Sequence, residues 1–67
     1  MPFVTIKMVE GHNQQRRDTI ARAVTQAIHE QTQIPKSAIW VVIEDVKASD
    51  WYTDAVTVAD QRAGKKP

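Results

Sequence analysis

The sequence predicts an α+β fold in which one helix joins two parallel strands and a short hairpin or arm follows. Residues 3–9 alternate between apolar and polar side chains, the pattern of a half-buried strand. Apolar residues then recur at three- and four-residue spacing over 14–31, which is typical of an amphipathic helix. Residues 38–43 form an almost unbroken apolar run, as expected for a parallel strand covered on both faces. Together these segments predict a βαβ unit.

The first strand and the helix are bounded by recognisable turn and cap residues. Val4, Ile6 and Met8 share one face of the strand, which ends at Glu10 and Gly11. Asn13 is the expected helix N-cap, because its side-chain oxygen can accept a free backbone N–H. The expected apolar helix face contains Ile20, Ala23, Val24, Ala27 and Ile28.

Pro35 cannot continue the helix, so residues 34–37 are predicted to form the loop that returns to the second strand. A crossover between parallel strands is expected to be right-handed. Residues 44–50 are polar and turn-like, and residues 51–52 with 55–59 predict the hairpin or arm, whose apolar side chains need a partner. Residues 62–67 lack periodicity and are expected to be a flexible tail. No repeat or second domain is visible, so residues 1–67 are expected to form a single domain.

Size and composition exclude several classes of protein. A chain of 67 residues buries only about 60% of its unfolded surface, so self-association is expected to stabilise it. It has no cysteine and two isolated histidines, so no metal site, disulfide or cofactor is expected. Nine basic and eight acidic residues give a net charge of +1, which gives little support to nucleic-acid binding. Without a membrane span or signal peptide, the expected location is the cytoplasm.

Pro2 is the main candidate for chemistry. Methionine aminopeptidase usually removes Met1 before a small residue, which would leave a secondary amine at the head of the first strand. A chain-terminal amine has a pKa near 8, and an apolar pocket lowers that pKa because the charged form loses solvation. Such an amine is a neutral base near pH 7. The alternative is that Pro2 only makes the chain start easy to process.

Several features occur together along the chain: Pro2 heads a strand, Glu10-Gly11 end it, one amphipathic helix follows, and then come Pro35, the run from Ile39 to Val46 and an aromatic at Trp51. This combination resembles the tautomerase superfamily. The resemblance is to small subunits of the 4-oxalocrotonate tautomerase type and covers residues 2–52. It implies a homohexamer built as a trimer of dimers by pairing of βαβ sheets. It also implies an isomerase that moves a proton in a small enol or 2-hydroxy-dienoate, with Pro2 as general base and acid in an apolar pocket near a subunit boundary.

The substrate-binding positions depart from the pattern of that family. Two arginines normally bind the substrate carboxylate and polarise its carbonyl, but His12 and Trp40 occupy the corresponding positions here. Trp51 corresponds to the aromatic pocket wall, and Tyr52 can donate a hydrogen bond to an oxyanion. All four are candidate substrate-binding residues. Their structural alternatives are an exposed turn for His12, the core for Trp40, a subunit interface for Trp51 and a loop for Tyr52. The cations that remain available as replacements are Arg16, Arg17, Arg62 and Lys65.

Two other functions remain open. Asp50 or Asp54 could activate water, which would make the chain a Pro2-dependent hydratase or dehalogenase of an unsaturated small acid, although both residues also suit a polar turn. The loss of both arginines instead favours a non-catalytic oligomeric module. The expected partners are therefore a small enol or keto acid and further copies of the chain.

Overall fold

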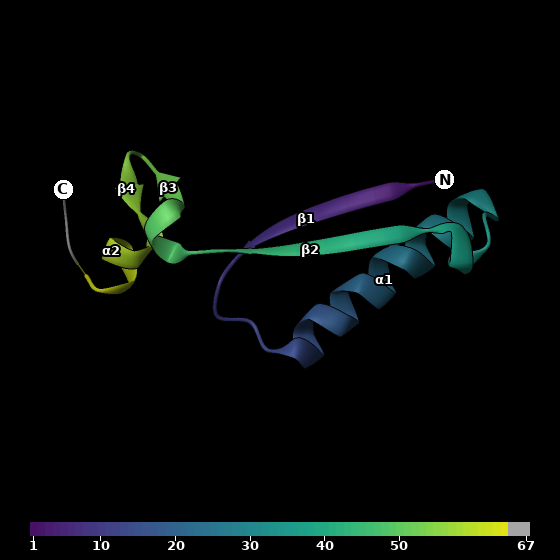
Figure 1. Cartoon of the computed structure of the whole chain (residues 1–67), viewed down its shortest axis with the longest axis horizontal. Coiled ribbons are helices and arrows are strands. Elements are labelled where there is room, and N and C mark those ends of the chain that lie inside the picture. Colours follow the sequence, from purple (N-terminus) through teal and green to yellow (C-terminus); the bar gives the residue numbers. More distant parts are fainter. Residues whose placement is uncertain (65–67) are drawn as a thin grey trace.

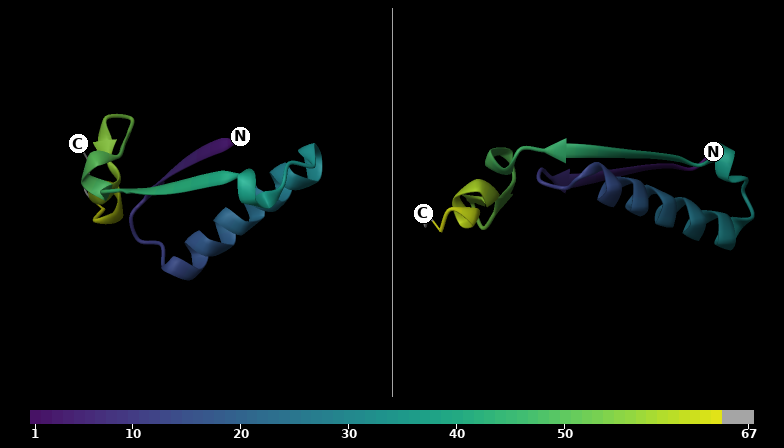
Figure 2. Two further views of the ribbon diagram at one scale, coloured as in Figure 1. Left: turned by 45° about the vertical axis from the view of Figure 1, so that its right-hand side comes forward. Right: turned by 90° about the horizontal axis from the view of Figure 1, so that it is seen from below.

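The computed structural model describes residues 1–64 and has the predicted βαβ order, with a separate C-terminal segment (Figure 1). Strand β1 spans Phe3–Val9, helix α1 spans Gln14–Thr32 and strand β2 spans Trp40–Val46. The strands are parallel, with Phe3 opposite Trp40 and Val9 opposite Val46. Helix α1 runs back along the strand pair, and the two further views show it on one side of the sheet (Figure 2). The predicted α+β class with two parallel strands is confirmed.

The ends of α1 follow from local chemistry. The Asn13 side chain accepts a hydrogen bond from the backbone N–H of Arg16 at 2.8 Å, as predicted for an N-cap. At the other end, Gln33 adopts a left-handed conformation with φ of 60° and donates its N–H to the carbonyl of His29. Pro35 follows two residues later, where the chain has already left the helix.

The buried face of α1 differs in part from the predicted one. Ala23 and Ala27 are exposed, whereas Ala21 and Thr25 are partly buried. Arg17 lies on the buried side and forms an ion pair with Asp45 of β2, with 3.1 Å between Nη1 and Oδ2. The inner face of α1 therefore keeps Ile20, Val24 and Ile28 but includes polar side chains beside them.

Strand β2 is covered on one face within a single chain, although its apolar run predicts cover on both. Exposure alternates along both strands, and the uncovered face has Phe3 at 65%, Trp40 at 54% and Val42 at 37% exposure. The strand also begins at Trp40 rather than at Ala38, because residues 36–38 form a short 3-10 turn. It continues to Val46 through residues that suggested a turn, since they pair with the end of β1.

The C-terminal segment forms a hairpin followed by a short helix. After a 3-10 turn at Ala48–Asp50, strands β3 (Tyr52–Thr53) and β4 (Val56–Thr57) pair around Asp54 and Ala55. Both turn residues have positive φ, 52° and 62°, as a tight two-residue hairpin turn requires.

Helix α2 spans Val58–Arg62, so the prediction of extended structure through residue 59 is wrong. The Thr57 hydroxyl accepts the backbone N–H of Asp60 at 3.0 Å, which caps the helix start. The region expected to be a flexible tail starts at Arg62, which is the last residue of α2, and residues 65–67 lie outside the described part of the chain.

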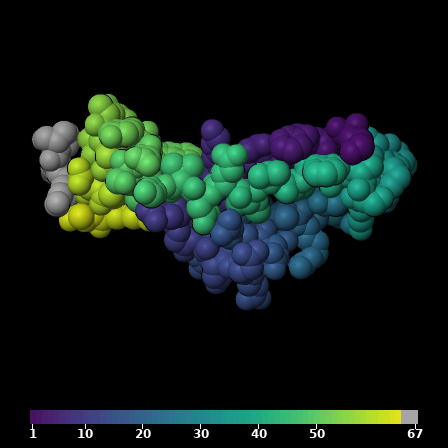
Figure 3. All heavy atoms as spheres, in the orientation of Figure 1, coloured from purple at the N-terminus to yellow at the C-terminus, as the bar shows by residue number. Residues whose placement is uncertain are grey.

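The chain is elongated rather than compact. Its extents are 48 × 22 × 14 Å, and its radius of gyration is 15.5 Å, against about 11 Å for a compact chain of this length. The residues that follow β2, as far as Gly64, gather at one end of the molecule (Figure 3). Among the described residues only Ile39 and Ala48 are buried hydrophobic residues. A chain with so little core needs further contacts to cover its apolar sheet face.

Candidate active site

Pro2 lies directly before β1, at the end of the sheet farthest from the C-terminal segment. It is partly buried, and its carbonyl accepts a hydrogen bond from the backbone N–H of Trp40 at 3.0 Å. Phe3 and Trp40 are opposite each other in the register and are both exposed. Two large apolar side chains therefore lie at the same end of the sheet as the candidate base, on a surface that nothing within residues 1–64 covers.

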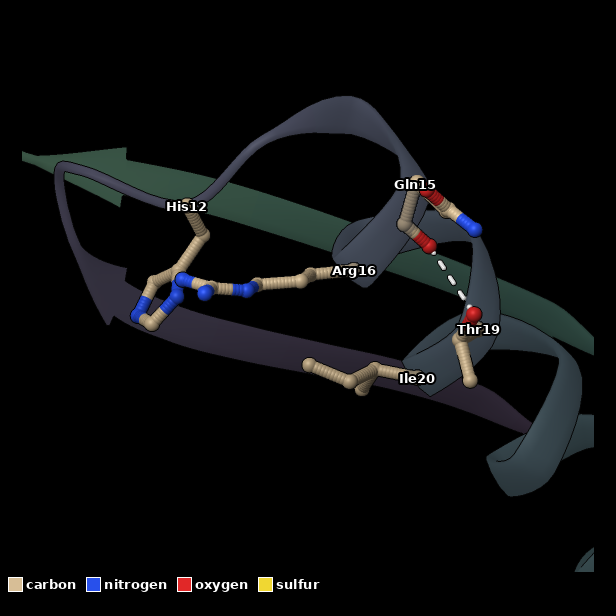
Figure 4. A pocket seen from close by; sticks show the side chains of 5 residues that line it. All are labelled: His12, Gln15, Arg16, Thr19 and Ile20. Atoms are coloured by element: carbon tan, nitrogen blue, oxygen red, sulfur yellow. Dashed lines mark hydrogen bonds between the residues drawn. The ribbon is translucent and has the colours of Figure 1, made fainter.

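His12 lies at the opposite end of β1, in the turn that leads into α1. Gly11, with φ of 119°, makes this turn possible because side-chain-bearing residues rarely adopt that conformation. His12 is partly buried and lines a hollow of about 460 Å³ together with residues on the first turns of α1: Gln15, Arg16, Thr19 and Ile20. In Figure 4, Arg16 extends from the helix toward His12.

The same turn is held to the C-terminal segment by hydrogen bonds. Glu10 accepts the backbone N–H of Ala48 through Oε2 at 2.7 Å, and its carbonyl accepts Nη1 of Arg62 at 3.1 Å. A side-chain carbon added at Gly11 would lie 3.7 Å from the same Arg62 nitrogen. Arg62 thus lies against the Gly11 turn although it is distant in the sequence.

The remaining candidates lie beyond β2, in the C-terminal segment. Trp51 is partly buried and its carbonyl accepts the backbone N–H of Val58 at 2.7 Å. Tyr52 is 61% exposed, and both Asp50 and Asp54 are exposed. In this single chain, these residues share the end of the molecule with the Gly11 turn rather than with Pro2 (Figure 1).

The candidates therefore form two separate groups within one chain. Seven strand residues at about 3.3 Å each separate Pro2 from the Gly11 turn by roughly 20 Å. Only Trp40 is adjacent to Pro2, and its exposed side chain shares a sheet face with Phe3. A single chain does not bring the candidate base to the other candidate substrate-binding residues, His12, Trp51 and Tyr52.

Two negative findings apply to residues 1–64. No group of three or more histidine, aspartate or glutamate side chains is arranged to hold a metal ion there. Neither helix in that range is long and apolar enough to cross a membrane.

Comparison with known proteins identifies the family. The sequence profile described as tautomerase enzyme matches residues 2–61, which is nearly the whole chain and begins at Pro2. The chain belongs to the tautomerase family.

Individual relatives agree with this assignment. A protein named probable tautomerase from Staphylococcus saprophyticus is 36% identical over 61 residues, covering 91% of this chain and all of the relative. The structure of TomN, a 4-oxalocrotonate tautomerase homologue in the tomaymycin biosynthetic pathway, has a TM-score of 0.88 at 29% identity and covers 92% of this chain and 95% of TomN. A 4-oxalocrotonate tautomerase isozyme from Methylibium petroleiphilum has a TM-score of 0.83 at 31% identity, and the match covers 87% of this chain and 94% of the isozyme chain. The resemblance stated from the sequence is confirmed.

Proposed function

We propose that this chain is an isomerase that moves a proton in a small enol or 2-hydroxy-dienoate, with Pro2 as general base and acid once Met1 has been removed. The observation that carries the proposal is the family match beginning at residue 2, together with the place of Pro2 at the head of β1. In the processed chain a neutral amine takes a proton from the enol oxygen or an adjacent carbon. The resulting ammonium returns that proton to another carbon of the conjugated system, so atoms and charge balance and no cofactor is needed.

The proposed pocket contains residues of more than one chain. Each of the two strands β1 and β2 is an edge of its sheet, and a two-fold symmetric pairing of identical edges is antiparallel. Antiparallel pairing puts the start of β1 in one copy near the end of β1 in the other. Pro2 of one copy then lies near the Gly11 turn of its partner, with His12 as a substrate-binding residue.

The uncovered sheet face supports a larger assembly. Phe3, Trp40 and Val42 are exposed on this face, and large apolar patches of this kind mark contact surfaces. We place Trp40 and Trp51 in the pocket wall or at the chain boundary, and Tyr52 as a donor toward the substrate oxygen. The proposed assembly is the homohexamer that the family resemblance implies.

The test is a tautomerase assay with phenylenolpyruvate on protein whose intact mass shows that Met1 is absent. A matched sample that retains Met1 has an amide nitrogen at Pro2, which is not basic, and it is expected to show only the uncatalysed rate. Equal rates in the two samples would contradict the role of Pro2.

If processed protein hydrates or dehalogenates an unsaturated acid but does not tautomerise the enol, the exposed Asp50 and Asp54 become the residues to test. A processed protein without any of these activities would favour a non-catalytic oligomeric module.

Substrate charge gives a second prediction. His12 and Trp40 stand where the resemblance implies two arginines. The kcat/KM of a dicarboxylate dienol is therefore expected to be lower than that of a monocarboxylate of similar length, by about tenfold or more. The measurement is kcat/KM for both substrates. Trp40→Arg is expected to raise kcat/KM for the dicarboxylate selectively, whereas Trp40→Leu, which adds no charge, is not. A parent protein that already prefers the dicarboxylate would show that two cations serve the site.

A further inference from the structure

Three arginines lie near the turn that contains Gly11, and they differ in whether the side chain has a partner within residues 1–64. Arg17 is paired with Asp45, and its side chain is 26% exposed. Arg62 donates a hydrogen bond to the carbonyl of Glu10. Arg16 is exposed and forms neither an ion pair nor a side-chain hydrogen bond within residues 1–64. Of the three, Arg16 is the cation whose guanidinium stays available for a ligand.

Arg16 also lines the hollow beside His12. A volume of about 460 Å³ lies within the range of about 300–1,000 Å³ that small-molecule sites occupy. The lining combines the aliphatic side chain of Ile20, the imidazole of His12 and the guanidinium of Arg16, and it contains no carboxylate. Figure 4 shows the Arg16 side chain extending from α1 toward His12. The hollow offers an apolar wall to a small organic body and a positive charge to an acid group.

Side chains rather than the helix terminus provide this charge. The backbone N–H of Arg16 already donates to Asn13, and the hydroxyl of Thr19 donates to the carbonyl of Gln15 at 2.9 Å (Figure 4). Both donors are therefore used within the helix. A guanidinium, in contrast, presents two parallel N–H groups that match the two oxygens of a carboxylate.

We infer that Arg16, with His12 beside it, binds the carboxylate of a small monocarboxylate acid in this hollow. Arg16 thereby replaces the arginine that the resemblance implies at position 12, one helical turn further along the chain. The inference rests on the proposed tautomerase function for its meaning in catalysis, and it names the substrate class of that site as a monocarboxylate. Because a single arginine without an ion-pair partner serves the hollow, one carboxylate is held there.

Binding of an inert acid tests the inference without any turnover. The full chain is titrated with benzoate and with uncharged benzamide, and the ring-proton NMR signals of His12 are followed. Arg16→Gln is expected to raise the dissociation constant for benzoate about tenfold or more and to leave that for benzamide unchanged. Arg16→Lys, which keeps the charge but not the paired donors, should fall between Arg16→Gln and the parent. Arg22→Gln removes an exposed arginine of the same helix outside the hollow and should match the parent.

Two outcomes would overturn the inference: benzoate that binds the parent no better than benzamide, and benzoate that binds Arg16→Gln as tightly as the parent. The assay with phenylenolpyruvate separates this inference from the proposed function. An active parent whose KM is unchanged in Arg16→Gln contradicts the inference and leaves the role of Pro2 intact. Arg16-dependent benzoate binding by an inactive parent contradicts the proposed function and leaves the carboxylate site intact.

Discussion

Pro2→Ala is expected to lower kcat/KM for phenylenolpyruvate by about 10²–10⁴-fold, the usual contribution of a positioned general base. Processing before alanine leaves a primary amine, so the variant removes the ring that fixes the nitrogen at the head of β1 while keeping an amino group. The measurement is a progress curve of the enol at several substrate concentrations, with intact mass confirming removal of Met1 in both proteins.

A matched control for this variant is Gln31→Ala, which shortens an exposed side chain of α1, away from the uncovered sheet face. It should keep the parental rate. Circular dichroism and sedimentation of Pro2→Ala should match those of the parent, since residue 2 contributes only its carbonyl to the contact with Trp40. A Pro2→Ala protein as active as the parent would remove Pro2 from the mechanism.

Val42→Asp is expected to abolish the assembly and, with it, the activity. Val42 lies opposite Thr5 on the uncovered sheet face, beside the exposed pair Phe3 and Trp40. A carboxylate buried there without a partner costs several kcal/mol, and symmetry repeats that cost in every copy. Sedimentation velocity at micromolar concentration should show a hexamer for the parent and smaller species for the variant.

Gln31→Asp introduces the same charge at an exposed position near the end of α1 and should sediment as the parent does. If Val42→Asp also loses helical circular dichroism, the isolated chain depends on assembly for its stability, as expected from its small core. A monomeric parent, or a variant that sediments as the parent does, would contradict the proposal that this face is an interface.

Local signals in the sequence account for most of the βαβ unit. The alternation along residues 3–9, the Asn13 cap and Pro35 each act within a few residues, so they are readable without the fold. The start of β2 was predicted two residues early, because the 3-10 turn at residues 36–38 has no strong apolar or turn signature. The start of α2 was missed because a five-residue helix capped by Thr57 resembles the alternating end of a hairpin.

The candidate site was only partly predictable for a different reason. Pro2 and His12 are recognisable from the order of residues along one strand, and the family that this order indicates was confirmed by comparison. The contact of Arg62 with Glu10 joins residues 52 positions apart, which no periodicity reveals. A cluster of basic residues on the first helical turn likewise gives no indication of which arginine is paired.

By itself the sequence determined the class of fold, the place of Pro2 at the head of a strand and the family to which the chain belongs, because these depend on local pattern and residue order. Only the tertiary structure decided that Arg17 is paired with Asp45, that Arg62 contacts the Gly11 turn and that Arg16 lines the hollow beside His12. It also showed that β1 separates Pro2 from those residues by its whole length. The physical reason is that pairing and separation depend on distances across the sheet and along a rigid strand, which residue order alone does not specify.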